Sequence, residues 1–324
     1  MSLAIKYLGL SLRNPLIIGS SSLTSDLDTV RELEDEGAAA LVLRSLYEEE
    51  VTGEQMDAFF QSESYGESSA EAETYFPDPE VALGPGEYLE HLQRVKQTVA
   101  IPVIASLCGS SADGWVSYAR LLEQAGADAV ELDLYHSASD GSTSAAEVEA
   151  QMIETVREVK RAINIPVAAR LTPLFTAFAN FAGRLDDAGV DGLVVFTRFH
   201  KIDIDVIELE LLRSLELSDS SELQLRLRAA ALLTGRVKAS IAISGGVHTA
   251  LDVVKATMAG ADVTQLVSAI LKHGPRYLRT LLAELQAWMA TNEWSSLDEM
   301  RGNMSYQRVP NPTAYERATY RLFH

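Results

Sequence analysis

The heptapeptide Gly189-Val-Asp-Gly-Leu-Val-Val195 opens with a glycine, passes through an acidic residue and ends in aliphatic side chains. Three further segments follow this pattern with a small or acidic residue after the glycine: Gly37-Ala-Ala-Ala-Leu-Val-Leu43, Gly126-Ala-Asp-Ala-Val-Glu-Leu132 and Gly260-Ala-Asp-Val-Thr-Gln-Leu266. Each follows an amphipathic helical stretch. The glycine suits the left-handed residue after a helix, and the aliphatic run suits a strand buried on both faces. Repeated joins of this kind predict a parallel β/α fold, which places its site at the carboxyl ends of the strands.

Outward from these joins, the sequence offers eight strand candidates whose spacing favours a closed (β/α)8 TIM barrel over an open doubly wound sheet. The candidates span residues 15–19, 40–43, 103–107, 129–134, 167–171, 192–196, 240–243 and 263–266. Helical patterns fall between them, at 115–124, 147–162, 177–188, 250–259 and 277–290. Residues 3–12, with Gly9 at the turn, predict a hairpin that closes the barrel bottom. The aspartates of the joins are interpreted as loop or cap residues, and not as catalytic acids, at the end opposite the site: Asp128, Asp191 and Asp262.

Two insertions interrupt an otherwise regular chain of 324 residues, which is expected to form a single barrel domain over residues 1–324. The first spans residues 48–84 after the second strand, and the other spans 198–222 after the sixth. Because both follow strands, both should overhang the face that carries the chemistry. No lysine or arginine lies between Arg44 and Arg94, so the first insertion is acidic. It is interpreted either as a solvated loop or as a lid or dock for a basic partner.

Composition limits the kinds of binding partner and the cellular compartment to be expected. A formal net charge of −19 argues against nucleic acid or an anionic membrane as a general partner. The apolar runs are too short to span a bilayer, and residues 1–6 lack a signal-peptide pattern. The single cysteine, Cys108, is compatible with a reducing compartment, so a cytoplasmic protein is expected. No metal site is expected, and a homodimer is left open.

Two loops at neighbouring strand ends favour phosphate binding. Ser244-Gly245-Gly246-Val247-His248-Thr249 follows the seventh strand candidate and opens a helix. Paired glycines let the backbone approach a ligand closely, and the start of a helix presents free N–H groups to an anion. Val267-Ser268-Ala269 follows the eighth strand, and the two loops together form the usual phosphate cradle of barrel enzymes. The alternative is a plain tight turn.

Two arginines at predicted strand ends point to an electron-rich ligand. Arg44 follows the second strand and Arg170 lies at the end of the fifth. A buried cation needs an anion or an electron-rich partner. A flavin meets this need, since its N1–C2 region gains negative charge on reduction and a nearby cation favours the reduced form. Salt bridges to Asp133 or to glutamates are the alternative for each arginine.

Several phrases taken together resemble the FMN-dependent dihydroorotate dehydrogenase family, closest to its bacterial dihydroorotate dehydrogenase-like branch. They are Asn14-Pro15-Leu16, Ser244-Gly245-Gly246-Val247, Gly260-Ala261-Asp262 and Leu297-Asp-Glu-Met-Arg-Gly302, with further matches at 104–107, 114–116, 118–120 and 175–185. The resemblance covers residues 3–324. It implies a (β/α)8 barrel that carries FMN at the strand carboxyl ends. It also implies a dehydrogenase that acts on the CH–CH bond of a small anionic substrate, as in pyrimidine biosynthesis.

The resemblance implies a set of cofactor-binding residues. They are Gly19, Ser20, Ser21, Arg44, Ser45, Arg170, Thr197, Gly245, Gly246, Val267 and Ser268. The last four would supply backbone donors to the phosphate. Arg170 would take the place of a family lysine near the flavin N1, and Arg44 would replace a second lysine that touches both flavin and substrate.

The implied substrate pocket departs from the family pattern. Asp133 and Thr197 stand where the family has asparagines that bind the pyrimidine, whose carbonyl and N–H groups need amide partners. The family base, a cysteine or serine, lies on the loop after the fourth strand. That loop here reads Tyr135-His136-Ser137-Ala138-Ser139, so the catalytic candidates are His136, Ser137, Ser139 and Arg44. An exposed loop histidine is the alternative for His136, and Cys108 is interpreted as a packing residue.

Three functions are therefore weighed. The first is an FMN-dependent oxidoreductase with a diverged pocket that turns over dihydroorotate poorly. The second is a flavin-free barrel lyase or isomerase that acts on a phosphorylated metabolite. The third is a catalytically degenerate scaffold that still binds flavin or phosphate.

Overall fold

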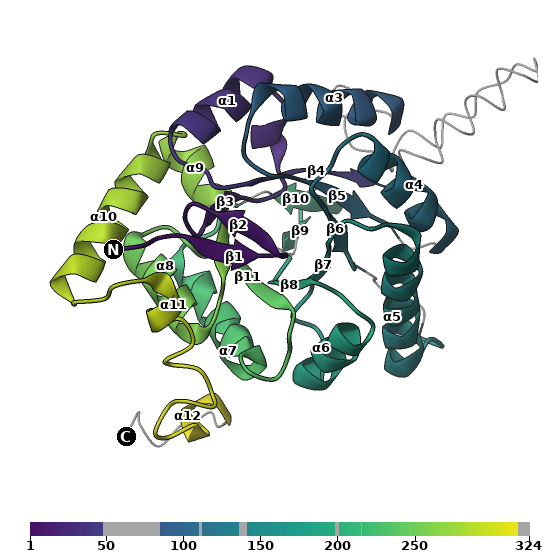
Figure 1. The fold of residues 1–324 in the computed structure, drawn as a ribbon. Helices are drawn as coiled ribbons and strands as arrows, with labels where there is room; N and C mark the ends of the chain where they lie inside the picture. Colours follow the sequence, from purple (N-terminus) through teal and green to yellow (C-terminus); the bar gives the residue numbers. More distant parts are fainter. Residues whose placement is uncertain (48–84, 110–111, 136–140, 198–200, 215, 317–324) are drawn as a thin grey trace, which may run out of the picture.

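The computed structural model describes residues 1–47, 85–109, 112–135, 141–197, 201–214 and 216–316 (Figure 1). Eight parallel strands close into a barrel in the order β11-β12-β3-β4-β5-β6-β7-β8. Their bounds are β3 (Leu16–Ile18), β4 (Leu41–Tyr47), β5 (Val103–Cys108), β6 (Ala129–Asp133), β7 (Val167–Leu171), β8 (Gly192–Val195), β11 (Ser240–Ser244) and β12 (Val263–Leu266). The fold is thus the (β/α)8 barrel expected from the sequence.

Helices surround the barrel, as Figure 1 shows. Those of the repeat are α1 (Leu27–Asp35), α3 (Pro85–Thr98), α4 (Ala112–Gln124), α5 (Ala145–Ala162), α6 (Phe178–Asp187), α7 (Leu223–Leu233) and α8 (Ala250–Ala259). The C-terminal part adds α9 (Ser268–His273), α10 (Tyr277–Thr291), α11 (Leu297–Met300) and α12 (Thr313–Glu316). Two 3-10 turns, Ser22–Thr24 and Ser220–Glu222, precede α1 and α7. The apolar faces of the helices pack on strands that are buried on both sides.

Strand β4 corrects one predicted boundary. The apolar run ends at Leu43, but the strand continues to Tyr47 and pairs there with β5, with Ser45 opposite Ser106. Arg44 therefore lies inside a strand and not beyond its end. The expected bounds of β7 and β12 agree with the structure.

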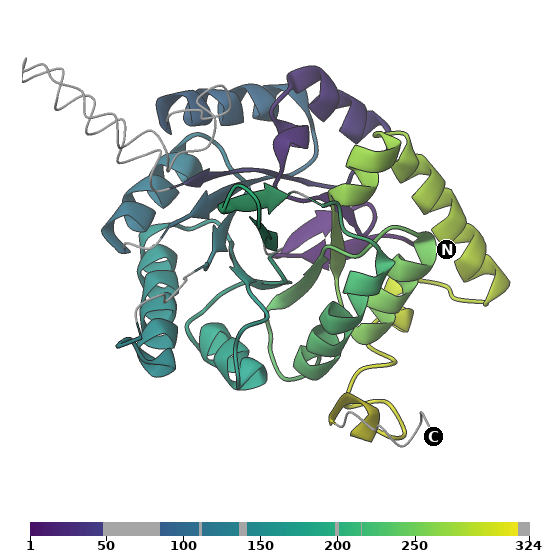
Figure 2. The ribbon, with the colours of Figure 1, turned by 180° about the vertical axis from the view of Figure 1, so that it is seen from behind.

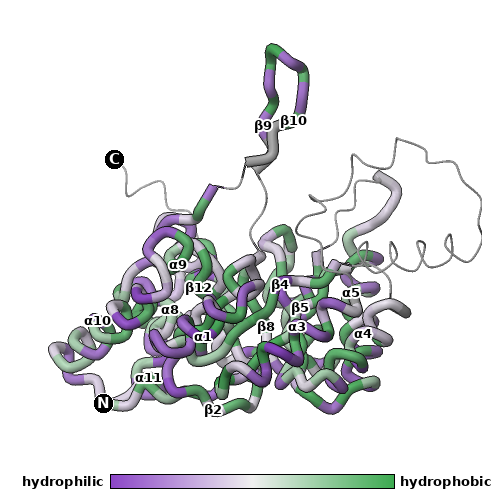
Figure 3. The backbone as a smooth tube through the Cα atoms, turned by 90° about the horizontal axis from the view of Figure 1, so that it is seen from above, coloured by the Kyte–Doolittle hydropathy of each residue, from purple (hydrophilic) through white to green (hydrophobic). Residues whose placement is uncertain are grey.

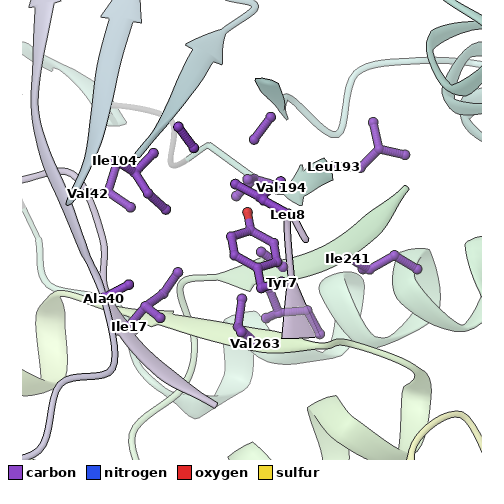
Figure 4. Packing of buried hydrophobic residues seen from close by; sticks show 14 of the residues in the cluster. Tyr7, Leu8, Ile17, Ala40, Val42, Ile104, Leu193, Val194, Ile241 and Val263 are labelled. Carbon is purple, nitrogen blue, oxygen red and sulfur yellow. The ribbon is translucent and has the colours of Figure 1, made fainter. Parts of the chain in front are cut away.

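An antiparallel hairpin closes the amino-terminal opening of the barrel. It comprises β1 (Ile5–Tyr7) and β2 (Leu10–Leu12), with Gly9 in its turn at φ +76°. Tyr7 and Leu8 lie among side chains from several barrel strands (Figure 4), and both are buried. A Cβ atom at Gly192 would lie 2.4 Å from Leu8 Cδ2, so the Leu8 side chain packs closely against the backbone of β8. The predicted bottom hairpin is confirmed.

The aspartates of the repeated joins serve as caps at this end. The Asp128 carboxylate accepts the backbone N–H of Val103 at 2.7 Å, and Asp191 accepts that of Val167 at 2.7 Å. Each also receives a lysine ammonium at 2.6 Å. Asp262 repeats the arrangement, with the N–H of Ile241 and a guanidinium as partners. Each carboxylate ties one βα unit to the next, as the cap interpretation requires.

A second hairpin lies at the opposite opening. It comprises β9 (Lys201–Asp205) and β10 (Glu210–Ser214), within the range expected for the second insertion. Figure 1 shows β1 and β2 across one opening, whereas Figure 2, seen from behind, shows β9 and β10 at the other. In the side view of Figure 3 this hairpin extends away from the barrel. Within the described ranges, no helix is both long and apolar enough to cross a bilayer.

Candidate functional site

A cavity of about 310 Å³ opens at the carboxyl ends of the barrel strands. Most of the residues that the sequence nominated for cofactor binding line it: Ser20, Ser21, Ser45, Arg170, Thr197, Gly245, Gly246, Val267 and Ser268. They come from several strands and the loops that follow them, so the barrel gathers groups that are far apart in the chain. The volume and the few convergent polar groups are those of a small-molecule site.

Two nominated residues lie elsewhere. Gly19 packs against the end of β12, where a Cβ atom would lie 3.0 Å from Val267 Cγ2. Arg44 is half-buried and does not line the cavity; its backbone N–H donates to Thr24 Oγ1 at 3.1 Å. Cys108 lines a separate small pocket with Leu46 and Trp115. The base candidates His136, Ser137 and Ser139, like the acidic segment 48–84, fall outside the described residues.

Ser218 joins the two loops of the expected phosphate cradle. Its hydroxyl accepts the N–H of Gly246 at 3.4 Å, and its own N–H donates to Ser268 Oγ at 3.1 Å. The hydroxyl also lies 3.1 Å from His248 Nε2. The chain that leads from β10 into α7 thus crosses the cavity wall where the loops after β11 and β12 face each other.

The start of α8 carries an acidic cap of its own. Thr249 and Asp252 form a reciprocal capping box. The Asp252 carboxylate accepts the backbone N–H of His248 at 3.1 Å and that of Thr249 at 3.0 Å. A carboxylate therefore lies at the start of α8, next to the glycine loop that was expected to hold a phosphate.

The glycine loop has no room for side chains. Gly246 has φ +76°, and a Cβ atom there would lie 2.5 Å from the backbone nitrogen of Leu223. At Gly245, with φ +86°, a Cβ atom would lie 2.9 Å from Arg226 Nη2. The Arg226 guanidinium donates to the carbonyls of Ser244 and Glu222, which fixes α7 against the loop. The backbone of residues 245–246 is therefore held at the cavity wall.

A charged ring of three side chains forms the cavity floor. Glu131 on β6 is fully buried and accepts Arg170 Nε at 2.7 Å with Oε1. Its Oε2 accepts Gln265 Nε2 at 2.6 Å, and the Gln265 carbonyl accepts Arg170 Nη2. The salt bridge between Arg170 and a glutamate, which was the alternative to a ligand, is therefore confirmed. Arg170 nevertheless lines the cavity, and this ring uses only two of its five N–H donors.

Asp133 places a carboxyl group on the cavity wall beside this ring. Its Oδ1 accepts the Thr197 hydroxyl at 2.8 Å. Burial raises the pKa of Asp133, against the opposing effects of Arg170 and the Thr197 hydrogen bond. Asp133 and Thr197, the two positions at which the resemblance implied a departure from the family pattern, thus bond to each other and present a carboxyl group at the cavity wall.

Three serine hydroxyls form a hydrogen-bonded chain that starts in the cavity: Ser20 and Ser45 line it, and Ser106 on β5 is fully buried. Ser20 and Ser45 approach to 3.1 Å between their Oγ atoms, and Ser45 and Ser106 to 2.8 Å. Hydroxyls donate and accept, so this chain can adapt to either kind of group on a ligand.

Sequence reasoning did not identify every residue of the site. The sequence does, however, contain a signal for two members of the charged ring. Glu131 and Gln265 interrupt the aliphatic runs of the second and fourth repeated phrases, and a polar side chain in a doubly buried strand needs a partner. Ser218 gave no such signal, because it lies in a polar stretch between the hairpin and α7. Tyr47 was missed with the end of β4.

Comparisons with known proteins point to a single family. A family profile described as dihydroorotate dehydrogenase matches residues 2–289. The catalytic subunit of dihydroorotate dehydrogenase B (NAD(+)) from Thermoplasma acidophilum is 27% identical over 302 residues, which cover 93% of this chain and 98% of the relative. The proteins of the same name from Methanothermobacter thermautotrophicus and Pyrococcus abyssi are each 26% identical, over 90% and 93% of this chain and 95% and 98% of the relatives.

Proposed function

The chain belongs to the dihydroorotate dehydrogenase family, and from this we propose that it uses FMN, bound in the cavity at the barrel mouth, to oxidise a small anionic substrate. As a member of that family it is an oxidoreductase acting on CH–CH bonds. The observation that carries the cofactor proposal is the shared cavity: the loops 245–246 and 267–268 lie on one wall, with the Arg170 cation at the floor.

The residues present fit FMN in kind. A phosphate needs close backbone approach, and the steric confinement of Gly246 holds main chain at the wall without a Cβ in the way. The flavin ring carries carbonyl and N–H groups, for which the hydroxyls of Ser20 and Ser45 are matched donors and acceptors. Arg170 would supply positive charge to the electron-rich edge of the ring. Bound FMN would accept the hydride when the CH–CH bond is oxidised.

The proton that leaves the substrate needs an acceptor on the protein. We propose the segment after β6 for this role, with His136, Ser137 and Ser139 as candidates, because it follows closely on Asp133 at the cavity wall. The names of the relatives include NAD(+), so NAD+ is the first electron acceptor to assay.

The test is the colour of the purified protein. We expect one flavin per chain, visible as a flavin absorption band and identified as FMN after heat release and chromatography. A colourless protein that cannot be loaded with FMN would overturn the proposal and return the flavin-free barrel lyase or isomerase to first place.

Arg170→Met is expected to make the bound flavin harder to reduce by at least tenfold in the reduction equilibrium, about 30 mV for a two-electron couple. The reason is that a cation beside the N1–C2 region favours the reduced form, and methionine removes it while keeping much of the volume. Anaerobic titration against a reference dye measures the potential. A potential equal to that of the wild type would mean that the arginine is only structural.

Asp133 is expected to make anion binding depend on pH. Its raised pKa means that its neutral form persists to higher pH than in a free aspartate. Below that pKa the carboxyl is neutral and can donate, whereas above it the carboxylate repels an anion. Orotate, used as a probe and followed by the flavin spectrum, should therefore bind more tightly as pH falls, and Asp133→Asn should abolish the dependence. Affinity that rises with pH would contradict the assignment.

A further inference from the structure

One charged group beneath the cavity has no role in the function proposed above. The Glu131 side chain is 0% exposed, and both of its oxygens are bonded, one to Arg170 Nε and the other to Gln265 Nε2. Gln265 in turn accepts from Arg170 Nη2, which closes a ring of three side chains. The three residues come from β6, β7 and β12, so the ring spans the barrel interior.

Water does not screen this carboxylate. The barrel is closed below it by the first hairpin, whose Tyr7 is fully buried and whose Tyr7 hydroxyl has no hydrogen-bond partner among the described residues. Burial and the nearby charge of Glu131 raise the pKa of Tyr7, in keeping with its place in the hydrophobic core beneath the ring. In such surroundings a charge acts over longer distances than it does at a surface. Glu131 therefore acts on Arg170 and on whatever lies above it.

The ring fixes the guanidinium in both position and effective charge. Two of its five N–H donors are held from below by Glu131 and Gln265, and Arg170 remains 8% exposed toward the cavity. The guanidinium therefore cannot rotate without breaking these bonds. A ligand in the cavity meets a positive charge that is backed by a negative one, so the field it feels is weaker than that of a lone arginine.

We propose that Glu131 is a positioning residue that holds the Arg170 guanidinium at the cavity floor and offsets part of its charge, and thereby lowers the reduction potential of the bound flavin. This inference rests on the proposed function, since it requires a flavin in the cavity. It differs from the Arg170 prediction in sign: loss of the cation lowers the potential, and loss of its counter-charge raises it.

The experiment compares the midpoint potentials of FMN-loaded variants. All are measured at one pH, because Asp133 also lines the cavity and its charge changes with pH. Glu131→Gln keeps the shape but removes the negative charge, and we expect reduction to become about tenfold more favourable, roughly +30 mV for two electrons. The double variant Glu131→Gln with Gln265→Glu moves the charge across the ring. All three hydrogen bonds can re-form, because the new amide at position 131 can accept from Arg170 Nε and donate to the new carboxylate at position 265. The potential of the double variant should therefore return to near the wild-type value.

Glu34→Gln is the matched control for the single change. Glu34 accepts the backbone N–H groups of Ala100 and Ile101 at the opposite end of the barrel, so its charge should not reach the flavin. We expect wild-type potential and flavin content from this variant.

The outcomes separate the two proposals. A wild-type protein that holds no flavin defeats the proposed function, and this inference with it. A flavin-loaded Glu131→Gln variant with an unchanged or lowered potential overturns the inference alone, as does a double variant that keeps the shift of the single one. If Glu131→Gln is too unstable to hold flavin, the double variant decides: flavin retained at a wild-type potential shows that the ring needs its one negative charge and supports the inference, and a tenfold shift in the reduction equilibrium overturns it.

Discussion

Gly246→Leu is expected to abolish the retention of FMN, with a loss of affinity of at least a hundredfold, about 3 kcal/mol. The first side-chain atom would lie 2.5 Å from the backbone nitrogen of Leu223, and main chain cannot rotate away as a side chain can. Either α7 or the glycine loop must shift, and both belong to the wall that we propose for the phosphate. The measurement is flavin absorbance per chain after gel filtration, followed by fluorescence titration of the apoprotein.

Gly126→Leu is the matched control for backbone strain. Gly126 also has positive φ, +97°, but a Cβ atom there meets nothing within 4 Å, and the residue lies at the opposite end of the barrel. Both variants carry the cost of a left-handed leucine, roughly 1–2 kcal/mol, and only one carries the clash. Thermal unfolding should show both chains folded. A fully loaded Gly246→Leu protein would remove the phosphate site from these loops.

Dihydroorotate is expected to reduce the bound flavin slowly or not at all, about 10⁴-fold below an enzyme whose pocket is built for it. The Asp133 carboxyl and the Thr197 hydroxyl bond to each other at 2.8 Å, so the amide donors that a pyrimidine ring requires are missing from these two positions. An ionised Asp133 would in addition repel the carboxylate of the substrate. The measurement is anaerobic bleaching of the flavin in a stopped-flow instrument.

Restoring the amides tests the reason for this expectation. Asp133→Asn together with Thr197→Asn should accelerate bleaching by dihydroorotate, whereas either change alone leaves a mismatched partner. Ser106→Ala serves as a control, since it removes a buried hydroxyl that bonds to Ser45 and not to Asp133 or Thr197. Fast, saturable bleaching of the wild-type protein would contradict the prediction, and His136, Ser137 and Ser139 should then be substituted to find the base.

The barrel could be predicted because its determinants are local. The glycine and aspartate of each join mark the end of a helix and the start of a strand, and the aliphatic run that follows fixes the strand itself. The same reasoning failed at β4, where Arg44 and Ser45 ended the apolar run although the strand continues to Tyr47. Strands turn polar where they reach the site, so hydrophobic pattern is least informative there.

The site could be predicted as a list of strand ends but not as an arrangement. Sequence alone indicated Arg170 and the two loops, yet it left open whether Arg170 met a ligand or a glutamate. The answer depends on Glu131 and Gln265, which lie 39 and 95 residues from Arg170 in the chain and meet it only when the barrel closes. Arg44 was expected at the site and does not line the cavity. Side chains alternate along a strand, so Ser45 and Tyr47 of β4 face the cavity whereas Arg44, the residue before Ser45, does not.

The first hairpin has a consequence for how the chain is made. Tyr7 and Leu8 precede every barrel strand in the chain, yet Tyr7 lies beside Val263 of β12, the last strand to emerge from the ribosome (Figure 4). The hairpin must therefore wait, with its apolar side chains uncovered, until almost the whole barrel has been synthesised. We expect chaperones to bind the exposed apolar side chains of the nascent chain during this interval. Slower translation would lengthen the exposure.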